Sequence, residues 1–527
     1  MKKKLAALLS ILLMISFIVV TGSSAFAVGG KQVLRMASAY VTDELDPASA
    51  QDTSTFTLLG GLFEGLVRLD ETGQAVPAIA KWWKVSNNGL TYTFTLRSNA
   101  KWSNNQLVKA TDFEYSWKRA LAPAAQNTYA YNMYPISNAK AYNTGKLKDV
   151  SKVGVKALNA TTLQVTLVEP IAYFPQLLAE PIFAPVPASV VKANKDWASN
   201  AATVVSNGPF KIKQWQKGKL VLVKNPSYYD ADKIRLTEVQ VIQPTWQTSS
   251  TAAYVKGNLD WVGGGEEIYF EELNDKAYKD YRVVPQASTY YYQFNVNKAP
   301  FNNLKIRKAL AMAVDRKAIN YGTPAYGFVP NGIHGVKNEF RFEFADNYFT
   351  EDTNKAKLLL QEGLKEEGLT ELPRFTVITN AGSHEQIADQ IVSTWEERLG
   401  VKVDIDVQEW AELLRNRSQN NFQVARAGWG ADYNDPASFL EYFTSWSSSN
   451  DSGWNNSAYD QYMKQAQRQT NAQLRNQLYA KAEKLLIDQM VILPIYYYKM
   501  DILQKRNLKG MHVKYEGTVD FSRAYFE

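Results

Sequence analysis

Strand-like and helix-like stretches alternate along this chain, and that alternation limits the folds it can adopt more than any other feature. Leu90 to Leu96 (LTYTFTL) is rich in the β-branched and aromatic residues that favour strands. Ile306 to Ile319 and Lys355 to Glu362 have helical composition instead. The first of these places apolar residues three and four apart on one face, as in a helix packed on a sheet: Ile306, Ala309, Leu310 and Ala313. The pattern predicts a mixed α/β architecture.

No internal repeat and no low-complexity linker interrupts this alternation. Repeats of about 20 to 50 residues are not evident, which disfavours solenoids and propellers. The segments that most clearly mark breaks between elements are APVP at 184–187, VGGGE at 262–266, KAPFNN at 298–303 and LPIYYY at 493–498. Lobes without a flexible linker must be joined by short crossings. We expect a compact body of several lobes between which a ligand can sit.

The chain of 527 residues contains no cysteine, and 45% of its residues are hydrophobic. This excludes thiol catalysis, cysteine-ligated zinc and iron–sulfur clusters. It also means that stability comes from a large core in more than one domain rather than from disulfides. The sequence predicts no metal and no cofactor.

The first 27 residues have the pattern of an export signal. Lysines at positions 2–4 precede the apolar run Leu5–Val20, and Ala25-Phe26-Ala27 is a small-x-small cleavage site. The apolar run of about 16 residues is short for a spanning helix, although a retained membrane anchor is the alternative. We expect cleavage after Ala27 and a location outside the cytoplasm, in the periplasm, at the cell surface or secreted.

Charge does not indicate a nucleic-acid partner. Removal of residues 1–27 lowers the formal charge from +7 to +4. No long run of lysine and arginine follows, and the aromatic residues do not interleave with a basic stripe. We therefore expect no nucleic-acid binding.

Several longer segments, in this order, carry a resemblance to a known family. They are LFEGL at 62–66, AKWWKVSNNGLTYTFTLRSNAKWSNNQLVKATDFEYSWKR at 80–119, STYYYQFN at 288–295, the IRKAL core of 299–315, and QEWAELLRNRSQNNFQVARAGWGADYNDPASFLEY at 408–442. Over nearly the whole mature chain they resemble the extracytoplasmic oligopeptide-binding proteins of ABC importers, bacterial solute-binding protein family 5.

The resemblance implies an α/β, two-lobe periplasmic-binding-protein-like fold (type II, cluster C) with an extra inserted domain. The first lobe would comprise 28–64, 188–287 and 498–527, the inserted domain 65–187, and the second lobe 288–497. Both lobes would close over an oligopeptide and then dock on the permease subunits of an ABC importer, and a monomer is expected. Many relatives carry a lipid-modified cysteine near the signal, but here Gly22 is followed by Ser23, so no lipid anchor is expected.

Asp432 is the central candidate for the site. It lies between aromatic and glycine neighbours, just downstream of Arg417 and Arg426, so the segment can hold both ends of a zwitterion. In relatives the aspartate of the Trp-x-Ala-Asp-Tyr segment receives the ligand's ammonium group, which implies this role for Asp432. Such a pair at about 4 Å gains roughly 4 kcal/mol at an effective dielectric of about 20, before desolvation. A turn or cap aspartate is the alternative.

For the ligand's carboxylate, the resemblance points to Arg417, Arg426 and His384. Arginine suits this role because its planar fork of donors matches a carboxylate. The alternatives are a structural ion pair for Arg426, a solvated helix residue for Arg417, and a cap or surface residue for His384. One relative has a second histidine where this chain has Ser418, which puts one option for binding the peptide's ends in doubt.

The remaining contacts and pocket walls come from the same residue-by-residue matching. They are Gln51, Asp52, Thr53, Tyr129, Tyr291, Gln293, Trp410, Leu414, Gly428, Trp429, Gly430 and Tyr498. Core packing is the alternative, above all for Tyr291 and Tyr498. The chain departs from relatives at Gly263 and Gly264, where they have tyrosine and asparagine, at Gln293 for glutamate, and at Glu180 for histidine. These changes imply pockets of altered size and charge.

Two other function classes stay open. Paired carboxylates such as Asp432 and Asp435 could serve hydrolysis, but no nucleophile elbow or HExxH motif accompanies them. The chain is therefore expected not to be an enzyme. The aromatic content of 13% could also stack on an oligosaccharide, and some relatives carry metal chelates or haem. A specific peptide pheromone is the third possibility.

Overall fold

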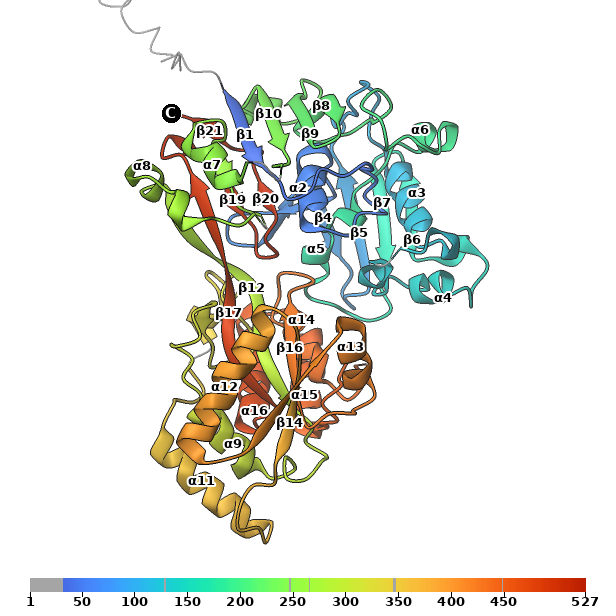
Figure 1. Cartoon of the computed structure of the whole chain (residues 1–527). Helices are drawn as coiled ribbons and strands as arrows, with labels where there is room; N and C mark the ends of the chain where they lie inside the picture. The colour runs from blue at the N-terminus through green and yellow to red at the C-terminus, as the bar shows by residue number, and fades with distance from the viewer. Residues whose placement is uncertain (1–31, 128, 246–247, 265, 345–346, 448) are drawn as a thin grey trace, which may run out of the picture.

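The computed structural model describes residues 32–127, 129–245, 248–264, 266–344, 347–447 and 449–527. The predicted export signal lies outside these residues. The described chain forms two lobes, and the strands β12 (Tyr281–Phe294) and β17 (Ile492–Gln504) pass from one lobe to the other (Figure 1). Within the described ranges, every helix is too short or too polar to traverse a lipid bilayer.

The two long strands pair with each other in both lobes. Tyr281–Pro285 lies antiparallel to Lys499–Leu503 in the upper lobe, and Thr289–Gln293 lies antiparallel to Ile492–Tyr497 in the lower lobe. The register shifts between Pro285 and Thr289, so a bulge interrupts the ladder where the strands cross. The boundaries predicted at 287/288 and 497/498 fall at this crossing, which supports them, and they stay a proposal.

One continuous sheet of eleven strands runs through both lobes of the described chain, in the order β15-β14-β16-β12-β17-β11-β1-β10-β9-β8, with β13 beside β17. The further members are β15 Val403–Gln408, β14 Phe375–Asn380, β16 Val424–Gly430, β13 Thr323–Pro324, β11 Trp261–Val262, β1 Val33–Ala37, β10 Glu238–Ile242, β9 Lys219–Lys224 and β8 Phe210–Gln216. In the lower lobe β14 runs parallel to both its neighbours. In the upper lobe β1 runs parallel to β10.

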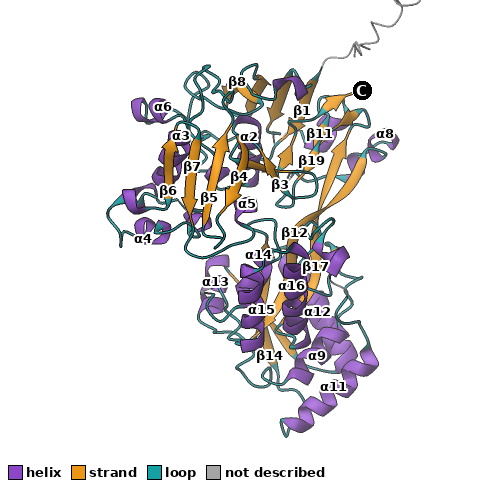
Figure 2. Cartoon of the chain, turned by 180° about the vertical axis from the view of Figure 1, so that it is seen from behind, coloured by secondary structure: helices purple, strands orange, loops and turns teal. Residues whose placement is uncertain are grey.

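A separate antiparallel sheet lies within residues 65–187, the predicted inserted domain. Its order is β4-β5-β7-β6, with bounds Ala80–Val85, Thr91–Leu96, Thr162–Thr166 and Val155–Asn159. Helix α3 (Ala110–Ala120) packs on it through Phe113 and Trp117, both fully buried (Figure 2). The strand predicted at 90–96 is confirmed as β5. The small sheets are β2–β3 (Val67–Leu69, Ala75–Pro77), β18–β21 (Leu508–Lys509, Tyr525–Phe526) and β19–β20 (His512–Val513, Val519–Asp520).

Helices cover the sheets. Their bounds are α2 Thr53–Leu62, α4 Ala139–Asn143, α5 Phe174–Leu177, α6 Ala188–Ala193, α7 Ser250–Val255, α8 Asp275–Tyr278, α9 Leu304–Ala313, α10 Phe340–Phe344, α11 Thr353–Glu366, α12 Ser383–Leu399, α13 Trp410–Ser418, α14 Ala437–Leu440, α15 Ser457–Arg468 and α16 Ala472–Asp488. The helix predicted at 355–362 lies within α11. The four apolar residues predicted to share a face of α9 are all fully buried.

The helix predicted at 306–319 is shorter than expected. It begins after Asn303, whose side chain accepts hydrogen bonds from the amides of residues 305 and 306, and it ends at Ala313. Val314 is extended, and the buried guanidinium of Arg316 donates to the carbonyl oxygens of Ala311 (3.2 Å) and Pro494 (2.8 Å). The prediction of six further helical residues was wrong, because the buried Arg316 side chain donates a hydrogen bond to the Ala311 carbonyl oxygen near the end of the helix.

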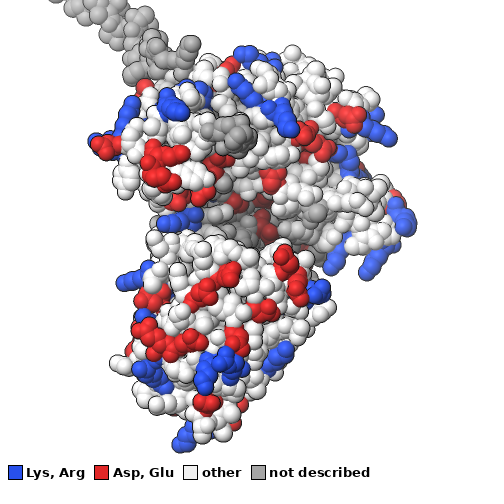
Figure 3. All heavy atoms as spheres, in the orientation of Figure 1, with Lys and Arg blue, Asp and Glu red and all other residues white. Residues whose placement is uncertain are grey.

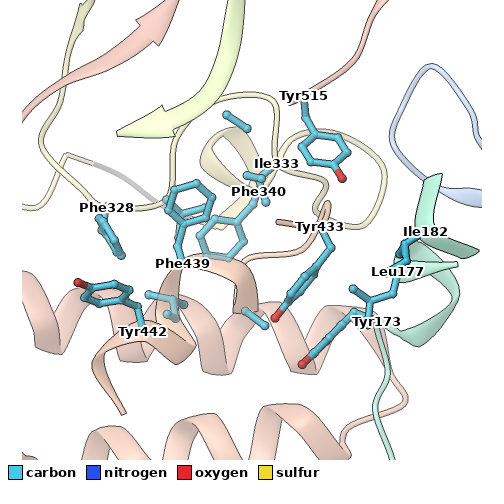
Figure 4. Close-up of a cluster of buried hydrophobic side chains, with 14 of the residues drawn as sticks. Tyr173, Leu177, Ile182, Phe328, Ile333, Phe340, Tyr433, Phe439, Tyr442 and Tyr515 are labelled. Atoms are coloured by element: carbon cyan, nitrogen blue, oxygen red, sulfur yellow. The ribbon is translucent and has the colours of Figure 1, made fainter. Parts of the chain in front are cut away.

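A buried carboxylate holds part of the lower lobe together. Glu483 of α16 is fully buried and accepts hydrogen bonds from the amides of Phe328 (2.6 Å) and Val329 (2.8 Å). It also accepts one from Tyr348 and forms an ion pair with Arg341. Phe328 itself lies in an aromatic cluster with Phe439 (Figure 4). Helix α16 is thereby attached to the loop behind the cleft.

We predict that Glu483→Ala destabilises the lower lobe by about 3–5 kcal/mol, because it removes the acceptor of two buried amides and the carboxylate of the buried ion pair with Arg341. Lys484→Ala, one residue along and in an exposed pair with Asp488, should cost less than about 1 kcal/mol. Urea unfolding followed by tryptophan fluorescence measures both. Equal midpoints for the two variants would contradict this role for Glu483.

Candidate functional site: a cleft between the lobes

The molecule is hollowed between the two lobes, and acidic side chains lie in that hollow (Figure 3). Asp432 belongs to the loop between β16 and α14 in the lower lobe. The loop is held from beneath by Ser438, whose hydroxyl accepts from the Asp432 amide (2.8 Å) and whose carbonyl oxygen accepts from the Trp429 indole (2.7 Å). The Asp432 carboxylate accepts a hydrogen bond from the hydroxyl of Tyr131, in the predicted inserted domain, at 3.1 Å. This contact spans the cleft.

The electrostatics of Asp432 suit a cationic ligand group. Burial raises the pKa of its carboxyl to about 6, and the hydrogen bond from Tyr131 offsets part of that rise. Within the described residues no lysine, arginine or histidine forms an ion pair with it. The turn role that was the alternative is seen at Asp435, which accepts from the Ala437 amide (3.0 Å) and pairs with Arg475 (3.1 Å).

Arg426 lies on β16, six residues before Asp432. Its guanidinium lies 5.0 Å from the ring centre of Tyr290 and 5.6 Å from that of Trp410. It donates to Nε2 of His384 at 3.2 Å. Over the part of the chain that the structure describes, Arg426 has no acidic partner, so the ion-pair alternative is not observed. A buried cation without a counter-ion favours an anionic ligand group.

His384, near the start of α12, is half-buried and stacks on Tyr290 with ring centres 5.6 Å apart. Burial and the neighbouring Arg426 charge lower its pKa to about 4. The imidazole is therefore neutral at neutral pH, with Nε2 accepting from Arg426 and Nδ1 carrying the proton. Nδ1 is buried and has no hydrogen-bond partner in the described ranges, so it is free to donate.

Arg417, at the end of α13, is in a different situation from Arg426. It is buried, not solvated, and its Nε lies 2.9 Å from Asp451. Its Nη2 donates to the hydroxyl of Tyr442 (3.0 Å). Asp451 also accepts from Gln293 at 2.7 Å. The charge of Arg417 is thus compensated inside the protein, and its role toward a ligand carboxylate stays a prediction.

The predicted wall residues fall into three groups by burial. Gln51, Asp52, Trp410, Leu414 and Gly430 are exposed, Thr53, Tyr129, Gly428, Trp429 and Tyr498 are half-buried, and Tyr291 and Gln293 are fully buried. Asp52 caps α2, accepting from the Thr55 amide at 2.8 Å. Tyr291 and Gln293 lie behind the cleft surface in this arrangement of the lobes. Their contact with a ligand, like that of the other wall residues, stays a prediction.

The positions that depart from relatives lie in different places. Glu180 is at the cleft wall of the upper lobe, where it accepts from the hydroxyl of Tyr515 at 2.5 Å. Gly263 lies against the hinge, because a Cβ there would come within 2.7 Å of Ile502. Ser418 is exposed on α13. A hollow of about 390 Å³ beside the hinge holds none of the predicted contact residues.

Sequence reasoning missed three features of this region. Tyr131, not its predicted neighbour Tyr129, contacts Asp432, and the two tyrosines stack 6.1 Å apart. Tyr173 of the predicted inserted domain stacks on Tyr433 of the lower lobe at 4.4 Å (Figure 4). Asp451, which neutralises Arg417, is 34 positions further along the chain. Only the spacing of tyrosines in YAYNMY (129–134) could have drawn attention to the first of these.

Comparisons with known proteins agree with this geometry. Residues 74–451 match the model described as bacterial extracellular solute-binding proteins, family 5 Middle. The chain is 36% identical over 498 residues to the oligopeptide-binding protein OppA of Bacillus subtilis, covering 92% of this chain and 90% of that relative.

Two solved structures show which arrangement of the lobes is present. The unliganded open form of the periplasmic murein tripeptide-binding protein MppA matches with a TM-score of 0.83 at 33% identity, over 94% of this chain and 97% of that one. Listeria monocytogenes OppA bound to peptide matches with 0.67 at 30% identity, over 94% and 99%. Both matches cover 94% of this chain, so the higher TM-score with the open form indicates that the two lobes are apart here. The predicted two-lobe fold is confirmed. The chain belongs to the bacterial extracellular solute-binding proteins of family 5.

Proposed function

We propose that this protein captures oligopeptides between its two lobes outside the cytoplasm and delivers them to the permease of an ABC importer. The observation that carries the proposal is the half-buried carboxylate of Asp432, which faces the cleft without a cationic partner in the described ranges. An uncompensated guanidinium, Arg426, lies on the preceding strand. A peptide with free ends supplies both missing charges.

The strand between the two charges is built to receive a peptide backbone. Arg426, Gly428 and Gly430 alternate along β16 and so share one face. The two glycines leave that face without side chains, which allows close approach of a ligand's main chain. The six residue-to-residue steps from Arg426 to Asp432 span at most about 20–22 Å. Allowing for the reach of the arginine side chain, this distance suits an extended peptide of about three to five residues.

Closure of the lobes completes the binding site in this proposal. The β12–β17 ribbon is the hinge, and its bulge concentrates the change in dihedral angles at one place. Asp432 and Arg426 are on the lower lobe, whereas Tyr129, Tyr131 and Glu180 are on the upper lobe. A ligand that contacts both sets binds the closed form better and shifts the equilibrium toward it. The Tyr131 hydroxyl holds the carboxylate of Asp432 until an ammonium group arrives.

The finer parts of the proposal concern location and partners. The leader is removed after Ala27, the protein is monomeric, and the ligand is released chemically unchanged on docking to the permease. Nucleic acid has no part in it. A neutral oligosaccharide is disfavoured as ligand, because it would leave the carboxylate of Asp432 and the guanidinium of Arg426 unpaired in the closed cleft. Supply of nutrients and delivery of a peptide signal share this binding step.

Asp432→Asn should weaken binding of free-amine peptides by about 10- to 100-fold, the value of one charge-assisted contact of about 1.5–3 kcal/mol. N-acetylation of the ligand should have the same effect on the native protein and little further effect on the variant. Titration calorimetry with an alanine tetrapeptide and its acetylated form measures this. Asp389→Asn, an exposed change on α12, is the matched control. Unchanged affinity in Asp432→Asn would overturn the proposed function.

Affinity should also depend on pH through Asp432. Its pKa of about 6 means that the empty protein carries a proton on this group in acid and must lose it to bind an ammonium. The dissociation constant should therefore be nearly constant between about pH 6.5 and pH 7 and rise toward tenfold per unit below about pH 5.5. The peptide amine stays charged throughout, since its pKa is about 8. Asp432→Asn should abolish the slope, and a slope kept by that variant would contradict the assignment.

The two arginines should respond differently to substitution. Arg426→Gln should weaken binding of peptides with a free carboxylate by about tenfold or more and should not weaken binding of their amides. Arg417→Gln should instead lower stability by about 3 kcal/mol, because it leaves Asp451 buried and unpaired. Calorimetry with acid and amide peptides and thermal unfolding separate the two effects. The opposite pattern would assign the carboxylate end to Arg417.

A further inference from the structure

A narrow hollow lies in the upper lobe beside Glu180, a carboxyl on which the charge of Asp432 acts. It has two adjoining parts of about 50 and 80 Å³, which share lining residues from α2 and the C-terminal segment, among them Phe56, Gly60 and Lys514. Phe63 and Leu69 add apolar surface to both parts. The hollow is therefore suited to one side chain with an apolar stem.

Carboxylates surround this hollow. Glu180 and Glu516 line its first part, and Glu64 lines the second. Tyr515 donates to Glu180, and Thr518 donates to one oxygen of Glu516. Burial and the neighbouring charge of Glu516 raise the pKa of Glu180 to about 8. The charge of Glu516 thus opposes the ionisation of Glu180 while the hollow is empty.

Two buried oxygens point to a missing ligand group. The side chain of Glu64 is 9% exposed, and its Oε2 has no hydrogen-bond partner in the described part of the chain. Oε2 of Glu516 is likewise buried without a partner there. An unsatisfied buried carboxylate oxygen is costly, so native structures seldom leave one without a use.

The cations near the hollow do not satisfy these groups. Lys514 lines both parts and lowers the pKa of Glu180 through its charge, but no ion pair within 4 Å joins it to a carboxylate in the described ranges. Arg68 reaches Glu64 only at 3.9 Å, and Arg523 pairs with Asp230. Asp520 adds another acidic group to the second part. Glu180 and Glu516 are left without a direct cationic partner.

The hollow is next to the place proposed for the ligand's amino end. The charge of Asp432 acts on Glu180 and on Tyr515, the residue that holds Glu180. The side chain of a peptide's first residue leaves the same carbon atom that carries the ammonium group. It is therefore the side chain that can enter the hollow when the ammonium group lies on Asp432.

We infer that Glu180 and Glu516 form a pocket for the cationic side chain of a lysine or arginine at the first position of the ligand. The inference rests on the proposed function and names the peptides that this cleft prefers. The apolar rings along the hollow cover the methylene stem, and the carboxylates receive the charged head. Glu180 and Glu516 in its first part, with Glu64 in the second, make this pocket acidic.

Titration calorimetry with three tripeptides tests the pocket: Lys-Ala-Ala, norleucine-Ala-Ala, which has the same stem without the charge, and Ala-Ala-Lys. The native protein should bind Lys-Ala-Ala about tenfold or more tightly than either of the others. In Glu180→Gln and Glu516→Gln the ratio of lysine to norleucine affinity should fall toward one. Glu397→Gln, an exposed change on α12, should keep both affinities and their ratio.

The outcomes separate this inference from the proposed function. Equal affinity of the native protein for Lys-Ala-Ala and norleucine-Ala-Ala would overturn the pocket and leave peptide capture standing. Tightest binding of Ala-Ala-Lys would place the cation pocket elsewhere and also overturn it. Absence of binding by all three peptides would overturn both. Greater proton release at about pH 7 with Lys-Ala-Ala than with norleucine-Ala-Ala, seen in buffers of different ionisation heat, would support ionisation of Glu180 on binding.

Discussion

The antiparallel pairing of β12 with β17 is the constraint on which the rest of the molecule depends. These two strands belong to one sheet that continues into both lobes, so the lobes share backbone hydrogen bonds and are not merely tethered. The bulge after Pro285 interrupts the ladder only where the strands cross. Motion between the lobes is thereby limited to a hinge, and each lobe can carry its own half of a binding site as a rigid body. The open form observed here has both halves in place before a ligand arrives.

The half of the proposed binding site on the lower lobe carries charges that the protein does not neutralise. Among the residues that the structure describes, the lower lobe presents Asp432 without a cation and Arg426 without an anion, at the two ends of one strand and loop. Elsewhere in the same lobe, buried arginines form ion pairs: Arg417 with Asp451, Arg475 with Asp435, and Arg341 with Glu483. The difference between these paired charges and the unpaired Asp432 and Arg426 points to a binding site, because charges that serve only the fold are paired within the protein.

The upper lobe adds selectivity to this general scheme. Ligand ends and backbone are common to all peptides, so contacts with them give affinity without sequence preference. Glu180 and Glu516 contact neither of these general features in the proposed complex, and the charge of Glu516 together with burial keeps Glu180 protonated until a cation favours its ionised form. Selectivity for a basic first residue would then come from two carboxyl groups of the upper lobe, away from the charges that hold the ligand's ends.

The sequence by itself determined the fold class, and it supplied the candidate residues for a site that stays a proposal. Local spacing in one sequence is enough to show the alternation of strands and helices and the buried face of α9. Family resemblance, which one sequence also carries, is enough to single out the segment around Asp432. It did not determine the end of α9, the pairing of Arg417 with Asp451 or the contact of Tyr131 with Asp432. Each of these joins residues distant in sequence, and only the packing of one element on another decides which charges are buried, paired or left free.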